Sequence, residues 1–271
     1  MNLRLVSLLL CLLGTVAGLL QAQPHILRLA TTTSTENAGL LEVLVPEFKN
    51  DHGYEVQVIA VGTGKALAMG ANGDVDVVLV HAPAAERKFV ADGHGVDHRA
   101  VMYNDFVVVG PPDDPAGIRG GDDIVKALNA VASNEALFVS RGDDSGTHKK
   151  ELQLWSEAGL NPNEEWYREV GQGMGKTLQI ADELRAYALT DRGTWLALRK
   201  KLDLTIVVER DERLFNPYGI MAVNPANYPD INYEGARRLI EWITSPKAQR
   251  MIWDYRVEGE PLFNPLAVIV E

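Results

Sequence analysis

Three hydroxyl- and glycine-rich segments give this sequence the means to bind an anion. TTTST covers residues 31–35, VGTGK covers 61–65 and SRGDDSGT covers 140–147. Hydroxyl groups and the free backbone N–H groups at the start of a helix are hydrogen-bond donors, so such segments can form a nest for an anion. The third segment adds Arg141, whose guanidinium is a charged donor. These residue types favour anion binding over a reaction.

A simpler interpretation is that these residues only cap helices. Ser and Thr are common N-cap residues, and one side chain is enough to cap one helix. Five consecutive hydroxyl residues exceed that need, and a cap does not explain why Arg141 shares a loop with Ser145. Three junctions of one kind in a single chain therefore favour a shared anion site.

The elements that would position these segments alternate along the chain from His25 onward. We predict strands at 26–30, 55–62, 74–82, 106–110, 136–140 and 205–209. We predict helices at 36–50, 64–71, 121–132, 145–158 and 176–188, a helical turn at 191–199 and, after the apolar run GIMAVNP, a long helix at 233–255. Such alternation predicts a parallel, doubly wound α/β sheet. Ligands of these sheets bind beyond the carboxyl ends of the strands, where TTTST, VGTGK and SRGDDSGT all lie.

The N-terminal segment predicts secretion. Arg4 precedes an apolar run at 5–20 with small residues near its end, which is typical of a signal peptide over 1–22. A membrane anchor is the alternative, but a bilayer span needs roughly 20 apolar residues. Cys11, the only cysteine, lies in this run after the bulky Leu10, which disfavours a lipid anchor. The mature chain would then have no cysteine, and hence no disulfide or cysteine-bound metal.

Composition and charge narrow the possible partners. The 271 residues are 46% hydrophobic with a formal net charge of −11, enough for one large globular domain or two modest ones. Loss of 1–22 removes one basic residue, Arg4, and changes the charge from −11 to −12. So acidic a chain is a poor candidate for binding nucleic acid or anionic membranes. Any bound anion must therefore be held by local donors.

Two motifs imitate other binding proteins. GQGMGKT at 171–177 resembles a phosphate-binding P-loop, but Val170 stands where the first glycine should be. The RGD tripeptide at 141–143 is an adhesion motif that arises readily by chance, and here it fits the loop chemistry better. We therefore predict neither nucleotide hydrolysis nor cell adhesion.

The sequence offers one candidate catalytic pair and one candidate metal-binding pair, and both are weak. Ser145 and His148 are three residues apart but lack the G-x-S-x-G elbow of a serine hydrolase. His94 and His98 could bind a metal from one face of a helix, but neighbouring glycines disfavour a helix there, and a solvated loop is the better interpretation. We predict no catalytic residues and no metal-cation site.

The motifs together resemble a known family. The chain resembles the TupA family of periplasmic tungstate-binding proteins, the solute receptors of tungstate ABC importers. The resemblance is carried by the segments TTTST, VGTGKAL, DVVLVHAP and SRGDDSGTHKKE. GMGKTL at 173–178 and LTDRGTW at 189–195 resemble later motifs of that family. The resemblance extends in order through nearly the whole mature chain.

The resemblance implies the type II periplasmic binding protein fold, two doubly wound lobes joined by a two-strand hinge. The crossings are expected near Asn104–Phe106 and Glu212–Asn216. Lobe 1 would then comprise 23–104 plus 216–271, and lobe 2 would comprise 105–215.

The resemblance also implies which residues bind the oxyanion. Lobe 1 would contribute Thr32, Thr33, Ser34 and Thr63, and lobe 2 would contribute Arg141, Ser145, Gly146 and Thr147, with Thr177 and 191–194 as further candidates. Tungstate is a fully deprotonated dianion, so a selective cavity should offer it only donors. An inward carboxylate from Asp143 or Asp144 would suit phosphate, which keeps a proton. We expect these two instead to position Arg141 or to bond the loop backbone.

The expected function is that of a periplasmic receptor. It would bind tungstate, or the nearly identical molybdate, between its lobes and deliver it to the membrane permease and ATPase of an ABC transporter. We expect a monomer with no cofactor and no enzymatic activity. A phosphate or sulfate receptor of the same fold and a secreted serine hydrolase are the alternatives.

Overall fold

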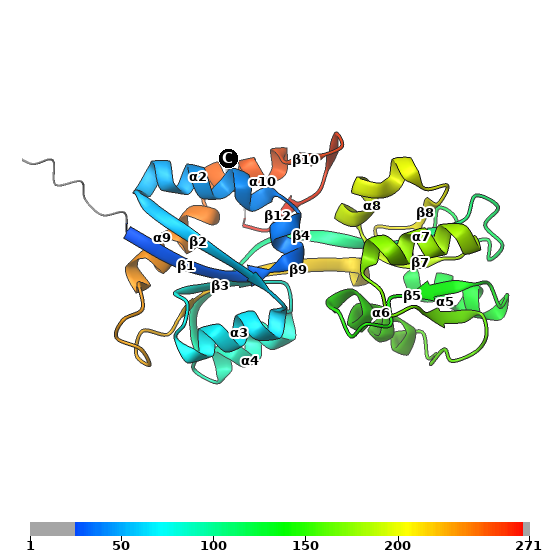
Figure 1. The fold of residues 1–271 in the computed structure, drawn as a ribbon, viewed down its shortest axis with the longest axis horizontal. Coiled ribbons are helices and arrows are strands. Elements are labelled where there is room, and N and C mark those ends of the chain that lie inside the picture. Colours follow the sequence, from blue (N-terminus) through cyan, green and yellow to red (C-terminus); the bar gives the residue numbers. More distant parts are fainter. Residues whose placement is uncertain (1–24, 268–271) are drawn as a thin grey trace, which may run out of the picture.

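The computed structural model describes residues 25–267 and shows two lobes side by side (Figure 1). The predicted signal peptide, including Cys11, lies outside the described residues. Two strands run from one lobe into the other, β4 (Gly95–Gly110) and β9 (Phe215–Val223). β4 pairs with β9 as far as Asp105 and with β7 from Phe106 onward, so its partner changes in the middle of the strand.

The left-hand lobe of Figure 1 has one mixed sheet between two layers of helices. Its strand order is β12-β4-β9-β3-β1-β2. β1 is parallel to β2 and β3, as the sequence predicts, whereas β9 is antiparallel to β3 and β4 because it returns from the other lobe. The strands are β1 (His25–Thr32), β2 (Tyr54–Val61), β3 (Val77–Val80) and β12 (Asn264–Pro265), with a hairpin of β10 (Arg256–Val257) and β11 (Glu260–Pro261). The helices are α1 (Thr33–Asn37), α2 (Leu40–His52), α3 (Thr63–Asn72), α4 (Pro83–Ala91), α9 (Tyr233–Ile243) and α10 (Pro246–Asp254).

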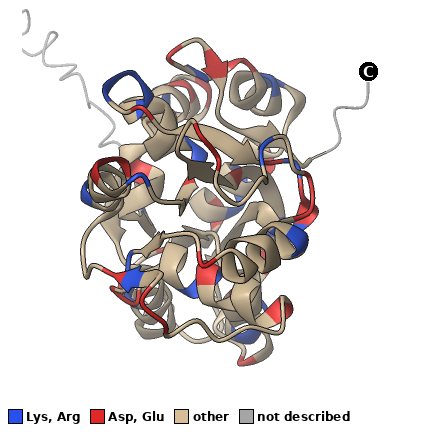
Figure 2. Cartoon of the chain, turned by 90° about the vertical axis from the view of Figure 1, so that its right-hand side faces the viewer, with Lys and Arg blue, Asp and Glu red and all other residues tan. Residues whose placement is uncertain are grey.

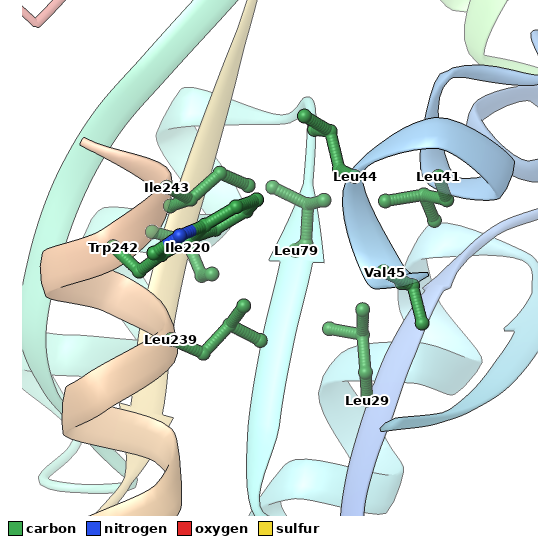
Figure 3. Close-up of a pocket in the computed structure, with 9 residues that line it drawn as sticks. All are labelled: Leu29, Leu41, Leu44, Val45, Leu79, Ile220, Leu239, Trp242 and Ile243. Carbon is green, nitrogen blue, oxygen red and sulfur yellow. The ribbon is translucent and has the colours of Figure 1, made fainter. Parts of the chain in front are cut away.

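Strand periodicity divides the core of this lobe between the two faces of the sheet. Leu79 packs with residues of α2 and α9, while its neighbours Val78 and Val80 pack with residues of α3 and α4, because successive side chains point to opposite faces. A void of about 10 Å³ remains on the α2 and α9 side, lined only by apolar side chains such as Leu29 and Trp242 (Figure 3). This space belongs to the core and offers no polar group to a ligand.

The right-hand lobe repeats the layered arrangement around the far end of β4. β7 and β8 pair with β4, and β5 pairs in parallel with β6. The strands are β5 (Phe138–Ser140), β6 (Tyr167–Glu169), β7 (Ala188–Asp191) and β8 (Thr205–Val208). The helices are α5 (Ile124–Ser133), α6 (Gly146–Glu157), α7 (Met174–Leu184) and α8 (Arg192–Leu198), with short 3₁₀ helices η1 (Arg199–Lys201) and η2 (Glu212–Leu214).

Two predicted helices are broken in the structure. The helix predicted at 36–50 is α1 followed by α2, because Gly39 takes a positive φ of 79° between them and the Tyr255 hydroxyl donates to the carbonyl of Ala38 at 2.7 Å. The helix predicted at 233–255 is α9 followed by α10, because Ser245 caps a new helix that has Pro246 in its first turn.

Other predicted boundaries were also wrong. The strand predicted at 106–110 begins at Gly95, and the helix predicted at 176–188 ends at Leu184, before β7. The sequence did not predict α4 or the short strands β6 and β7. Long-range pairing with β9 explains the extra length of β4, since its first half has no strong apolar alternation of its own.

Candidate functional site

A cavity of about 610 Å³ lies between the two lobes. It is lined from the left-hand lobe by the starts of α1 and α3, and from the right-hand lobe by the starts of α6, α7 and α8. Eight of the nine predicted binding residues line it: Thr32, Thr33, Ser34, Thr63, Arg141, Ser145, Gly146 and Thr147. Segments more than a hundred residues apart in the sequence thus meet at one place.

Helix N-termini make this cavity rich in donors. The first N–H groups of a helix have no carbonyl partner inside the helix, and they carry partial positive charge. Side chains satisfy some of them, since Thr32 accepts from the N–H of Thr35 and Ser145 accepts from the N–H of His148. The caps of α3 and α7 are Gly62 and Gly173, which have no side chain to do this. No capping side chain therefore accepts from the first-turn N–H groups of α3 and α7, although the N–H of Lys176 bonds to the carbonyl of Gly173 at 3.0 Å.

The loop after β5 holds the charged donor in place. Arg141 donates to Asp143 Oδ2 through Nε at 3.1 Å and Nη2 at 2.5 Å. Asp143 Oδ1 also accepts from the backbone N–H of Ser145 at 3.2 Å. Burial opposes ionisation of Asp143, but the bonds from Ser145 and Arg141 outweigh it and lower the pKa of this carboxyl. Asp143 thus positions Arg141 and bonds the loop backbone, as we expected, while Asp144 is exposed and pairs with Lys149.

Asp191 brings a carboxylate to the cavity wall. It is the one acidic residue among the described residues that line the cavity. It caps α8, and its two oxygens accept from Thr194, one from the backbone N–H at 2.8 Å and one from the hydroxyl at 2.7 Å. Both oxygens therefore have a local donor, which lessens but does not remove the repulsion that an anion would meet.

The structure does not bring Thr177 to the cavity. This residue is fully buried in the first turn of α7, where its hydroxyl donates to the carbonyls of Gln172 and Gly173. The Thr177 side chain stabilises the start of the helix, and the cavity lining from α7 comes instead from Met174 and Gly175.

The arrangement of Ser145 and His148 does not favour a serine nucleophile. The His148 ring accepts from the backbone N–H of Asp144 through Nδ1 at 3.0 Å, and its Nε2 lies 3.3 Å from Glu169. The Ser145 hydroxyl instead accepts from the His148 backbone N–H as a helix cap. Neither ring nitrogen is in position to take the serine proton.

The other histidine pair does not form a metal site. His98 Nε2 lies 2.9 Å from the buried Glu86, and His94 lies in the turn before β4. No cluster of three or more metal-ligating side chains occurs among residues 25–267.

Sequence reasoning missed a polar network that adjoins the first-lobe donors and itself lines the cavity. His81, which follows β3, places Nε2 3.1 Å from Thr32 Oγ1 and 3.2 Å from Ser34 Oγ. Its Nδ1 lies 3.0 Å from Asn216 Oδ1, and Asn216 Nδ2 donates to Asn104 at 2.7 Å. Burial lowers the pKa of His81, so its ring is neutral near pH 7. The only sequence signal was the position of His81 at the end of DVVLVHAP, directly after a buried strand.

Comparison with known proteins identifies the family. Residues 21–247 match a family model described as a PBP superfamily domain. The tungstate-binding protein TupA of Peptoclostridium acidaminophilum is 52% identical over 88% of this chain and 85% of its own length. This chain belongs to the TupA family of the PBP superfamily.

Solved structures agree with this membership. The TupA tungstate-binding protein from Desulfovibrio alaskensis is 46% identical, with a TM-score of 0.86 over 90% of this chain and 100% of that one. The tungstate ABC transporter structure from Geobacter sulfurreducens is 54% identical, with a TM-score of 0.75 over 85% of this chain and 98% of that one. The type II periplasmic binding fold that the TupA resemblance implied is therefore confirmed. The lobe boundaries and the individual binding residues stay predictions.

Proposed function

We propose that this chain binds tungstate, or molybdate, in the cavity between its lobes and delivers it to the membrane permease and ATPase of an ABC importer. The observation that carries the proposal is the convergence of Thr33, Arg141 and Thr147 with the starts of five helices around one space. Nearly every polar group on that wall can donate a hydrogen bond, which suits a dianion whose oxygens only accept. The TupA relatives, which are named as tungstate-binding proteins, support the same ligand.

Binding would close the two lobes on each other. The cavity of about 610 Å³ is larger than a five-atom oxyanion can fill, so donors of both lobes can reach the ion only if the lobes approach. β4 and β9 are the two connections about which they could turn. An ion that bonds to both lobes stabilises the closed state over the open one.

We further propose a periplasmic location, a monomer and no enzymatic activity. Among the described residues no helix has the length and apolar character to cross a bilayer. In Figure 2, acidic and basic residues are interspersed along the ribbon, and the formal net charge is −11, consistent with a partner other than nucleic acid. The contacts of Ser145 and His148 argue against the hydrolase alternative.

A phosphate receptor is the second candidate, because Asp191 places an acceptor at the cavity wall. A protonated oxyanion could donate to that carboxylate, whereas tungstate could not. Calorimetric titration of the mature chain with tungstate, molybdate, sulfate and phosphate separates the candidates. We expect tungstate or molybdate to bind at least about 1,000-fold more tightly than phosphate, a difference of about 4 kcal/mol. Tight binding of phosphate alone would refute the proposal.

A further inference from the structure

His81 lies between the hinge strands and the first-lobe donors. Its ring bonds on one side to Asn216 of β9 and on the other to Thr32 and Ser34. Asn216 is paired with Asn104 of β4 both through the strand register and through their side chains. The chain of contacts therefore runs from the point where both strands cross between lobes to two hydroxyls of the cavity wall.

The hydrogen-bond pattern fixes the tautomer of this ring. Asn216 uses its NH₂ group to donate to Asn104 Oδ1, so the Asn216 oxygen faces the imidazole. An oxygen can only accept, which requires a proton on His81 Nδ1. In the neutral ring Nε2 then has no proton and accepts from a hydroxyl.

This tautomer decides where the hydroxyl protons point. Thr32 Oγ1 accepts from the N–H of Thr35, and it lies 2.6 Å from Thr35 Oγ1. With a neutral His81, either Thr32 or Ser34 must turn its single proton toward Nε2 and away from the cavity. A protonated His81 would donate from Nε2 instead, and both hydroxyls could then donate to an anion.

We propose that His81 is a positioning residue of the oxyanion site: through its bonds to Asn216, Thr32 and Ser34 it sets the direction of the first-lobe hydroxyl donors, so that binding of a dianion is coupled to uptake of a proton by His81. The inference rests on the proposed function. His81 itself lines the cavity, and in this proposal it acts through the two hydroxyls, which bond the oxygen atoms of the ion. Nothing in the sequence motifs or in the names of the relatives assigns this role.

The surroundings of His81 allow the coupling to be observed. The ionisable groups near it are Asp191 of β7 and Tyr218 of β9, whose ring centroid is 4.8 Å from that of His81. Arg141 lines the same cavity from the other lobe, and Glu86 of α4 bonds to the N–H of Ala82 next to His81. The groups contributed by α1 and β4, Ser34 and Asn104, are uncharged.

The sign of the effect follows from linkage. A bound dianion favours the imidazolium, so the pKa of His81 must be higher in the complex than in the free protein. The affinity for the dianion then rises as the pH falls from the pKa of His81 in the complex to the pKa of His81 in the free protein. Above and below this pH window the affinity is constant. The dissociation constant should fall by up to about tenfold per pH unit within the window.

Calorimetry of the mature wild-type chain with sodium tungstate, in two buffers of different ionisation enthalpy between about pH 6 and about pH 8, measures the proton uptake. We expect net uptake in the wild type and none in His81→Gln, whose amide can still bond to the hydroxyls but does not titrate. His52→Gln, an exposed change in α2 outside the cavity lining, is the matched control and should keep the uptake. Uptake that persists in His81→Gln, or none in the wild type, overturns the proposal.

Nitrogen NMR of histidine-labelled wild-type protein gives a second test that needs no variant. We expect a neutral ring protonated at Nδ1 for His81 in the free protein and an imidazolium in the complex. A ring protonated at Nε2 alone in the free protein would contradict the hydrogen-bond assignment. If the wild type binds no oxyanion at all, the proposed function fails, whereas the free-state tautomer still decides the geometry of His81.

Discussion

Removal of the Arg141 guanidinium should weaken oxyanion binding more than any other single truncation in the cavity. Arg141 is the one arginine or lysine among the described lining residues, and its side chain is only 18% exposed. A hydrogen bond to a charged partner contributes about 1.5 to 3 kcal/mol, so Arg141→Ala should raise the dissociation constant of tungstate by about 10- to 150-fold.

A second effect increases this loss. In the wild type, Asp143 Oδ2 accepts two hydrogen bonds from Arg141. In Arg141→Ala the Asp143 carboxylate stays beside the cavity without its counter-ion. Repulsion of a dianion should add to the lost bond. The double variant Arg141→Ala with Asp143→Asn removes the stranded charge and should therefore bind more tightly than Arg141→Ala alone.

Isothermal titration calorimetry with sodium tungstate measures all of these variants. Arg185→Ala is a matched control, since Arg185 is an exposed arginine of the same lobe that pairs with Asp113. Thermal melting should show that each variant folds. An Arg141→Ala affinity within about threefold of the wild type, less than about 0.7 kcal/mol, would refute the role of this residue.

Two further predictions concern α6 and α7. Thr147→Val removes a hydroxyl from the cavity and should weaken tungstate binding by about tenfold in the same titration. Thr177→Val should leave the affinity unchanged, because the Thr177 hydroxyl bonds to a backbone carbonyl at the start of α7. Burial raises the pKa of Glu151 to about 7, even though its carboxylate accepts from Tyr167 at 2.7 Å. Because the folded-state pKa is raised, stability from the protonated carboxyl is full below its ordinary value and is lost as the pH rises through about 7. Glu151→Gln should therefore melt several degrees above the wild type near pH 8.5, a free-energy difference on the order of 3 kcal/mol, and at nearly the same temperature near pH 4. A pH-independent difference in melting temperature would contradict this.

The chemical character of the site follows from its residue types and from their positions after predicted strands. TTTST and VGTGK follow the adjacent parallel strands β1 and β2, whose carboxyl ends meet at one edge of a sheet, whereas SRGDDSGT follows β5 in the other lobe. The sequence therefore predicts that the first two junctions are neighbours, and the facing of the two lobes brings the third segment to the same cavity. The hydrogen-bond donors could also be identified from residue type alone, because a hydroxyl or a guanidinium can donate in any fold.

The polar residues that bond to those donors are brought together by long-range packing. His81, Asn104 and Asn216 are common residue types without a local motif, and they meet through the pairing of β4 with β9. Thr177 looked like a donor in GMGKTL, but the direction of its side chain depends on the turn of α7 that surrounds it. Long-range contacts likewise set the break at Gly39 and the length of β4, because contacts between distant residues can outweigh weak local preferences.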